Sequence, residues 1–275
     1  FMNVDKIAAF RNLNIKGTHN FVSGYDNDVY KEMDHGTKTL STIAMNQPTV
    51  FVGTAPKADF WLLRTEDYST ESPAEEDFWI AAVEFSDSVG VDIISSSLGY
   101  HGFDDISMNY RYSDLNGRTA AISQAASRLA SKGMILVNSA GNDGMGTWKK
   151  INVPADAHDI LTVGAVTLDK VNAPFSSIGP TADGRIKPDV MAYGCPTNVV
   201  SGRGYIIPDN GTSFACPLIA GMVACLWQAC PNKSAKEILD IVRQSGNNCQ
   251  SPDNIMGYGI PDFWSAYQSA TRYNQ

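Results

Sequence analysis

The chain has 275 residues, of which 43% are hydrophobic, and it carries a formal net charge of -8. This length and composition suffice for one large domain with a substantial core. The negative charge, with no basic stripe to neutralise phosphates, excludes nucleic acid as the expected partner. No signal peptide is recognisable, and the apolar stretch 218–229 is too short to span a bilayer.

Apolar runs typical of buried parallel strands alternate with helical segments along the chain, and turn residues bound each run. This alternation predicts an α/β fold, a three-layer α/β/α sandwich with a mostly parallel central sheet, in a single domain over residues 1–275. Ligands of such sheets bind beyond the carboxyl ends of the strands. The expected strands are 60–63, 91–95, 134–137 and 160–163, and the expected helices are 73–89, 117–132, one beginning near Ser213, 234–244 and a short one after Pro261.

Acidic residues gather where the 73–89 helix begins, at Glu71, Glu75, Glu76 and Asp77. Carboxylates are favourable at a helix N-terminus, so a solvated helix start is the expected role of this cluster.

Five cysteines leave at least one thiol unpaired. Cys216 and Cys225 fall within the helix after Ser213, where we expect small buried apolar side chains. Cys230 and Cys249 are either free or the one pair worth testing for a disulfide. No His or Cys spacing indicates zinc, and none of the cysteines has the turn-to-helix context of a nucleophile.

Ser213 lies between small residues where a loop turns into an apolar helix. A serine there either caps a buried helix or acts as a nucleophile whose oxyanion is stabilised by the unpaired N–H groups of the helix start. Pro217 is expected in the first turn of this helix, since proline is best tolerated there.

Two further segments favour the nucleophile. His35 precedes Gly36 and a helix rich in small residues, so a neutral imidazole there can accept the serine proton. His19, His101 and His158 lack a comparable context and are expected to be surface or structural residues. Asn142 follows the apolar run 134–137, where it is either a turn former or a donor to a tetrahedral intermediate.

In the order His35, Asn142, Ser213, these segments resemble the subtilisin-like serine proteases, the subtilases of peptidase family S8. Further matching segments lie at 96–99, 163–166, 175–180, 187–190 and 257–259. The resemblance implies a subtilisin-like fold and a serine endopeptidase. It makes Ser213 the nucleophile, His35 the general base and then acid, and Asn142 the oxyanion donor beside the Ser213 N–H.

The family's catalytic Asp, which precedes the His at the end of a strand, has no counterpart in the chain. Asp5 lies at an expected helix start, and Asp26, Asp28 and Asp34 lie in polar loops. We expect the Asp and its strand to come from a companion N-terminal fragment, released by cleavage before Phe1. Without them the chain should lose about 10⁴ in turnover, so the rival interpretation is a pseudoprotease or peptide-binding module.

The resemblance also sketches a substrate cleft that pairs with extended peptide backbone. Tyr100 is expected to narrow it. Asp143 and Asp156 either favour a basic substrate side chain or are simply solvated. The expected substrate-binding residues are Ser96, Ser97, Leu98, Gly99, Ala140, Gly141 and Asn152, with Val153 and Pro154 closing the base.

Family membership would further imply a secreted or cell-envelope enzyme acting on proteins or peptides after zymogen processing. Many subtilases bind calcium through loop oxygens. Asp26 with Asp28, and Asp104 with Asp105, are oxygen-rich, but their spacing is irregular. No metal site is therefore assigned, and no cofactor is expected.

Overall fold

The computed structural model describes residues 1–22 and 26–272 of the domain expected over 1–275. Four parallel strands form the main sheet in the order β5–β6–β7–β8. A separate parallel pair joins β1 to β4. The strands are β5 (Ile93–Ser96), β6 (Ile135–Ser139), β7 (Leu161–Thr167), β8 (Val190–Cys195), β1 (Asn14–Asn20) and β4 (Asp59–Arg64).

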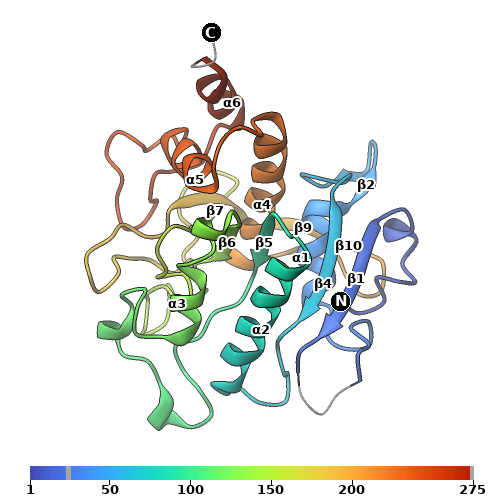
Figure 1. Cartoon of the computed structure of the whole chain (residues 1–275), viewed down its shortest axis with the longest axis horizontal. Coiled ribbons are helices and arrows are strands. Elements are labelled where there is room, and N and C mark those ends of the chain that lie inside the picture. Colours follow the sequence, from blue (N-terminus) through green and yellow to red (C-terminus); the bar gives the residue numbers. More distant parts are fainter. Residues whose placement is uncertain (23–25, 273–275) are drawn as a thin grey trace.

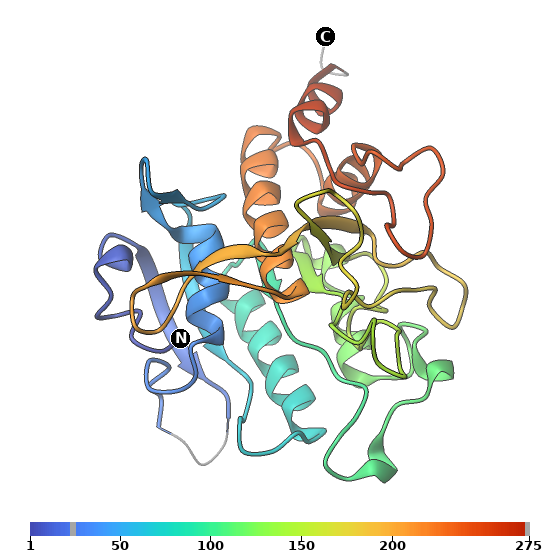
Figure 2. The same ribbon diagram turned by 180° about the vertical axis from the view of Figure 1, so that it is seen from behind.

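Helices cover both faces of this sheet, which confirms the expected α/β/α layers. Figure 1 views the face covered by α2 (Ala74–Ser88) and α3 (Ala121–Ala126). Figure 2 shows the opposite face, with α1 (His35–Ala44) and α4 (Thr212–Ala229) in front. Helices α5 (Ala235–Gln244) and α6 (Phe263–Arg272) pack against α4.

Smaller elements complete the described chain. Strands β2 (Asn46–Gln47) and β3 (Phe51–Val52) form one antiparallel pair, and β9 (Thr197–Val200) and β10 (Ile206–Asp209) form another. The β9–β10 hairpin leads directly into α4 (Figure 2). The 3-10 helices are η1 (Ala8–Phe10), η2 (Ile106–Met108), η3 (Tyr112–Asp114) and η4 (Ala130–Lys132).

Strand β6 shows why the main sheet is buried on both faces. Its side chains alternate, so Ile135 and Val137 join the core beneath α4 while Leu136 joins the core beneath α2 and α3. All residues of β6 are buried. A strand with two apolar faces is typical of parallel sheets between helical layers.

The expected helix over 117–132 is wrong in its extent, because only α3 and η4 are helical there. Gly117 adopts a left-handed φ of 71°, and its N–H donates to the buried carboxylate of Asp156. This bond holds the segment before Ala121 outside the helix. Gly133, in the left-handed conformation, ends η4, which confirms the expected stop.

The expectation of a solvated acidic start to α2 is wrong for two of its residues. Glu75 and Glu76 are only 1% and 4% exposed. Glu75 accepts the backbone N–H groups of Asp67 and Ser72, and Glu76 accepts the hydroxyl of Tyr110. Burial raises the pKa of both carboxyls, and these hydrogen bonds oppose the rise.

All five cysteines are free, so Cys230 and Cys249 are not joined. Cys216 is buried and its Sγ lies 3.2 Å from the carbonyl oxygen of Val137. Cys225 is exposed, contrary to expectation, because it falls on the α4 surface that faces a cleft. Helix α4 has the length and apolar composition of a membrane span, but 61% of it is buried within the fold, as in a core helix.

A buried charge cluster fastens α5 to the sheet. Asp189 receives the Lys187 ammonium at 2.7 Å and the Arg243 guanidinium at 2.9 Å. It also accepts the backbone N–H of Thr162 in β7. Burial alone would raise the pKa of Asp189, but the two cations outweigh burial and lower it. The carboxylate is therefore charged, and it is the ion-pair partner of both Lys187 and Arg243.

Asp189→Asn should lower the free energy of unfolding by about 3–5 kcal/mol, because it leaves the buried Lys187 ammonium without a counter-charge and removes one of the two carboxylates that pair with Arg243. Urea denaturation followed by circular dichroism measures this. Asp240→Asn is the matched control, since Asp240 also pairs with Arg243 but is 74% exposed; its cost should be about 1 kcal/mol or less. Equal effects of the two changes would contradict the role given to Asp189.

Candidate active site

Ser213 is positioned by a hydrogen-bond exchange with Ser97, which follows β5. Pro217 lies inside α4 rather than in its first turn, contrary to expectation. Proline has no N–H, so it cannot donate to the carbonyl group of Ser213 four residues earlier. The Ser97 hydroxyl donates to that carbonyl at 2.8 Å, and the Ser213 hydroxyl donates to the Ser97 carbonyl at 3.4 Å. The nucleophile is thus tied to the end of the sheet.

Asn142 is oriented by Thr212, the residue before the nucleophile. The Asn142 Oδ1 accepts the Thr212 N–H at 2.9 Å and the Thr212 hydroxyl at 3.0 Å. With its carbonyl end held on that side, the amide Nδ2 is left as a donor toward the cleft, which Asn142 lines. No sequence pattern singled out Thr212; its only signal was a hydroxyl beside Ser213.

His35 is the first residue of α1 and lines the same cleft as Ser213 and Asn142. Its ring centroid lies 6.1 Å from that of Phe214. Among the described residues, the Ser213 hydroxyl is bonded to Ser97 rather than to His35. The imidazole and the hydroxyl therefore share one cleft without the hydrogen bond that proton transfer requires.

Charges around His35 are balanced by Lys38, one turn along α1. Its ammonium lies 3.0 Å from Asp209 and 3.5 Å from Asp34. Burial and the Lys38 cation lower the pKa of His35, while Asp209 and Asp34 oppose this. Within the described chain, no carboxylate forms an ion pair with His35. The neutral imidazole is thus favoured, but no acid orients it.

The other histidines have structural surroundings, as expected. His19 stacks on Phe85, and His101 stacks on Trp148 with ring centroids 4.7 Å apart. His158 lies against Gly117, next to the site of Asp156.

The cleft beside Ser213 has two walls, formed by the chain after β5 and the chain after β6. Of the expected substrate-binding residues, Ala140 is fully buried and the remaining six line the cleft. Tyr100 does not narrow it, because Tyr100 is buried and its hydroxyl donates to Glu66. The backbones of Tyr100 and Val153 pair at 2.8 and 3.0 Å, and Val153 and Pro154, which were expected to close the base, do not line the cleft. The six lining residues are Ser96, Ser97, Leu98, Gly99, Gly141 and Asn152.

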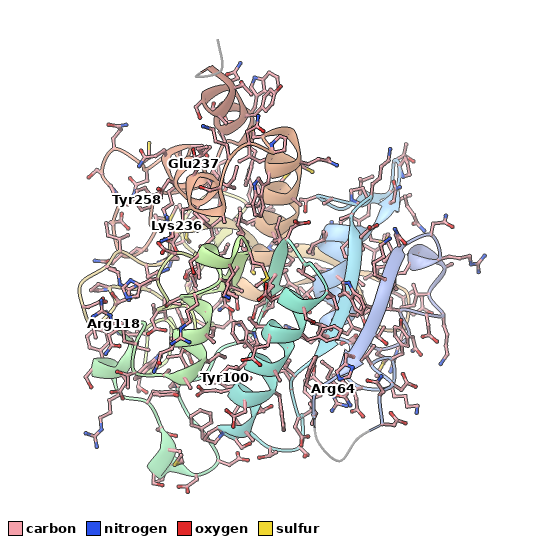
Figure 3. All side chains as sticks on the ribbon, viewed as in Figure 1. Arg64, Tyr100, Arg118, Lys236, Glu237 and Tyr258 are labelled. Atoms are coloured by element: carbon pink, nitrogen blue, oxygen red, sulfur yellow. The ribbon has the colours of Figure 1, made fainter. Side chains whose placement is uncertain are left out.

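The cleft continues between the two sheets, and its total volume is about 1550 Å³. We call this part the edge groove; it is lined by residues 59–64 of β4 and 93–96 of β5. Among the described strands, β4 pairs only with β1 and β5 only with β6. In Figure 3, Tyr100 and Arg64 lie in the lower half of the molecule; Tyr100 follows β5, and Arg64 is the last residue of β4. Side chains of α2, such as Trp79 and Val83, and of α4, such as Ala220 and Ala224, form the other sides of the edge groove.

Comparison with known proteins identifies the family of the chain. The model of the subtilase family matches residues 11–259. The chain belongs to the subtilase family. It is 28% identical to subtilisin DY of Bacillus licheniformis over 88% of the chain and 80% of the relative. It is 29% identical to subtilisin NAT of Bacillus subtilis subsp. natto over 83% of the chain, but it spans only 54% of that relative's length.

Solved structures show the same fold. The self-cleaved protease domain of PatA superimposes with a TM-score of 0.76 at 20% identity, over 98% of this chain and 93% of that one. MycP1 from the ESX-1 type VII secretion system gives a TM-score of 0.69 at 19% identity, over 96% of this chain and 83% of that one. At such identities the likeness concerns the fold.

The loop carboxylates considered for calcium are engaged by groups of the protein itself. Lys31 lies 2.7 Å from Asp26 and 3.2 Å from Asp28, so its ammonium already neutralises the first pair. Asp104 accepts the Thr70 hydroxyl and the Glu71 N–H, and Asp105 accepts from Ser107. The described residues contain no group of three or more potential metal ligands.

Lys38→Met should raise the pKa of His35, because it removes a nearby cation and leaves Asp34 and Asp209 facing the imidazole. Nitrogen-15 NMR titration of the His35 ring measures this without requiring activity. Lys170→Met, on an exposed turn, is the control and should leave the pKa of His35 unchanged. A lowered or unaltered pKa in Lys38→Met would contradict the charge balance described above.

Proposed function

We propose that this subtilase is the catalytic part of a serine endopeptidase that cleaves peptide bonds through an acyl-enzyme on Ser213. The single observation that carries the proposal is the meeting of Ser213, His35 and an Asn142 amide fixed by Thr212 in one cleft. A pure peptide-binding cleft needs no oriented amide donor beside a serine at a helix start.

In the proposed reaction, the Ser213 hydroxyl attacks the substrate carbonyl carbon while His35 accepts its proton. The Nδ2 group of Asn142 and the Ser213 N–H stabilise the oxyanion. His35 then protonates the leaving amine as the C–N bond breaks, and water hydrolyses the ester by the same route. The Ser213 hydroxyl must first turn from the Ser97 carbonyl toward His35.

The triad Asp, in this proposal, lies on a strand from outside residues 1–275, supplied by a companion N-terminal fragment that fills the edge groove. Unpaired backbone groups inside a parallel sheet are costly, and a strand there would pair with both β4 and β5. The apolar side chains of α2 and α4 would cover its two faces. A carboxylate at its end would reach the cleft that contains His35.

Substrate would bind as an extended strand along residues 96–99, with broad tolerance for its sequence. We further propose that the enzyme acts in a secreted or cell-envelope form after zymogen processing, as its subtilase membership suggests. A pseudoprotease is the second candidate. It is favoured by one observation, the lack of both a carboxylate and a Ser213 hydrogen bond at His35 among the described residues.

Fluorophosphonate labelling, followed by intact mass spectrometry of everything that co-purifies, tests both parts of the proposal. Label on wild-type chain, none on Ser213→Ala, and a co-purifying Asp-containing peptide would support a two-chain protease. Label on a chain extended beyond Phe1 would place the Asp in a contiguous segment and refute the companion. A chain that carries neither label nor companion would be the pseudoprotease.

Asn142→Ala should lower kcat by about 10²–10³ with little change in KM, because Nδ2 contacts the oxyanion only in the transition state; that magnitude was measured on the corresponding Asn of subtilisin itself. Steady-state hydrolysis of a fluorogenic peptide by an unlabelled sample of the same preparation measures this. Asn232→Ala, on an exposed loop, should leave both constants unchanged. An equal decrease of kcat in the two variants would contradict the role of Asn142 as oxyanion donor.

A further inference from the structure

Two glycines and an asparagine shape the part of the cleft next to Ser213. A Cβ atom added to Gly99 would lie 3.0 Å from the Cβ of Asn152, and one added to Gly141 would lie 3.0 Å from its Nδ2. The Asn152 side chain is therefore packed between the two walls, in contact with both. We call the position of Asn152 the floor of this pocket, which is the part of the cleft next to Ser213.

Asp143 is fixed at this floor and still reaches solvent. Its Oδ2 accepts the Asn152 amide at 2.9 Å, and its backbone N–H donates to the Ser177 hydroxyl at 3.0 Å. The Asp143 side chain remains 29% exposed and lines the cleft. Asp156, the other acid considered from the sequence, is fully buried and accepts from Gly117 and Ser123. Of these two acids, only Asp143 lines the cleft.

The pocket presents acceptors, and beside Asp143 the Nδ1 of the His101 imidazole lies 3.9 Å from the carboxylate Oδ2. Besides Asp143, its lining residues Ser97, Leu98, Gly99, Gly141 and Asn152 are all uncharged. Asn152 is 8% exposed, and its side-chain Oδ1 has no hydrogen-bond partner among the described residues. A buried acceptor without a donor is unfavourable, and a planar guanidinium offers donors to a carboxylate and a carbonyl together.

Resting on the proposed endopeptidase function, we propose that Asp143, held in place by Asn152, selects substrates with arginine or lysine immediately before the scissile bond. The carbonyl of that residue is the one Ser213 attacks, so its side chain is the one that enters the pocket between the walls. Asp143 is thus a specificity-determining residue, and the enzyme cleaves after basic residues.

The test uses two acetylated tetrapeptide amides that differ only in ending with arginine or with citrulline, which has nearly the same shape but no charge. Their binding to the Ser213→Ala protein is measured by calorimetry, so no turnover is required. Arginine should bind about tenfold to a hundredfold more tightly, the usual range for hydrogen bonds to a charged group.

Asp143→Asn, made in the same protein, should abolish this ratio while leaving citrulline binding unchanged, since an amide oxygen at 143 can still accept from Asn152. Asp143→Glu keeps the charge and should retain the arginine preference. Asp92→Asn, which removes a more distant carboxylate of the cleft, is the matched control and should keep the full ratio.

Equal binding of the two peptides, a ratio that survives Asp143→Asn, or no measurable binding of either peptide would overturn the proposal. Failure of the proposed catalysis has a different signature. Loss of fluorophosphonate labelling with the arginine preference intact would refute the endopeptidase and leave the selective pocket standing.

Discussion

Helix α4 passes beneath all four strands of the main sheet and also packs against α1. That packing sets the geometry of everything functional, since the helix begins at the nucleophile and its apolar length is anchored in the core. The strand ends that carry Ser97 and Asn142 and the helix that carries His35 all meet α4 near Thr212. The position of Ser213 at the start of α4 is thus fixed by the buried apolar contacts along the rest of the helix.

A second constraint acts at the opposite side of the cleft, where the main sheet and the β1–β4 pair face each other across the edge groove. Among the described residues, β4 and β5 have no strand partner on the sides that face this groove, and no carboxylate forms an ion pair with His35. The strand that we propose as a companion would therefore pair with the sheet and bring its carboxylate toward His35 at the same place, the edge groove. A single strand with a terminal carboxylate would satisfy both needs.

Much of the fold and the principal site could be predicted from the sequence, because local signals carried them. Glycines and small residues mark the turns around His35, Asn142 and Ser213, and apolar runs mark the strands. The features that could not be predicted depend on contacts between residues that are distant in the sequence. Glu75 is buried because loop N–H groups cap it, and Asp143 differs from Asp156 only through what folds against each. Likewise, Thr212 and Ser97 gained their roles from contacts across the cleft.

The presence of Pro217 in the second turn of α4 has a wider mechanical consequence. Pro217 has no N–H to donate to the Ser213 carbonyl, so that carbonyl accepts its hydrogen bond from Ser97, in the chain that follows β5, rather than from its own helix. Residues 93–96, just before Ser97, line one side of the edge groove. The chain that lines the edge groove is thus the same chain that holds Ser213 through the Ser97 hydrogen bonds, so the position of the nucleophile depends on how that chain is placed.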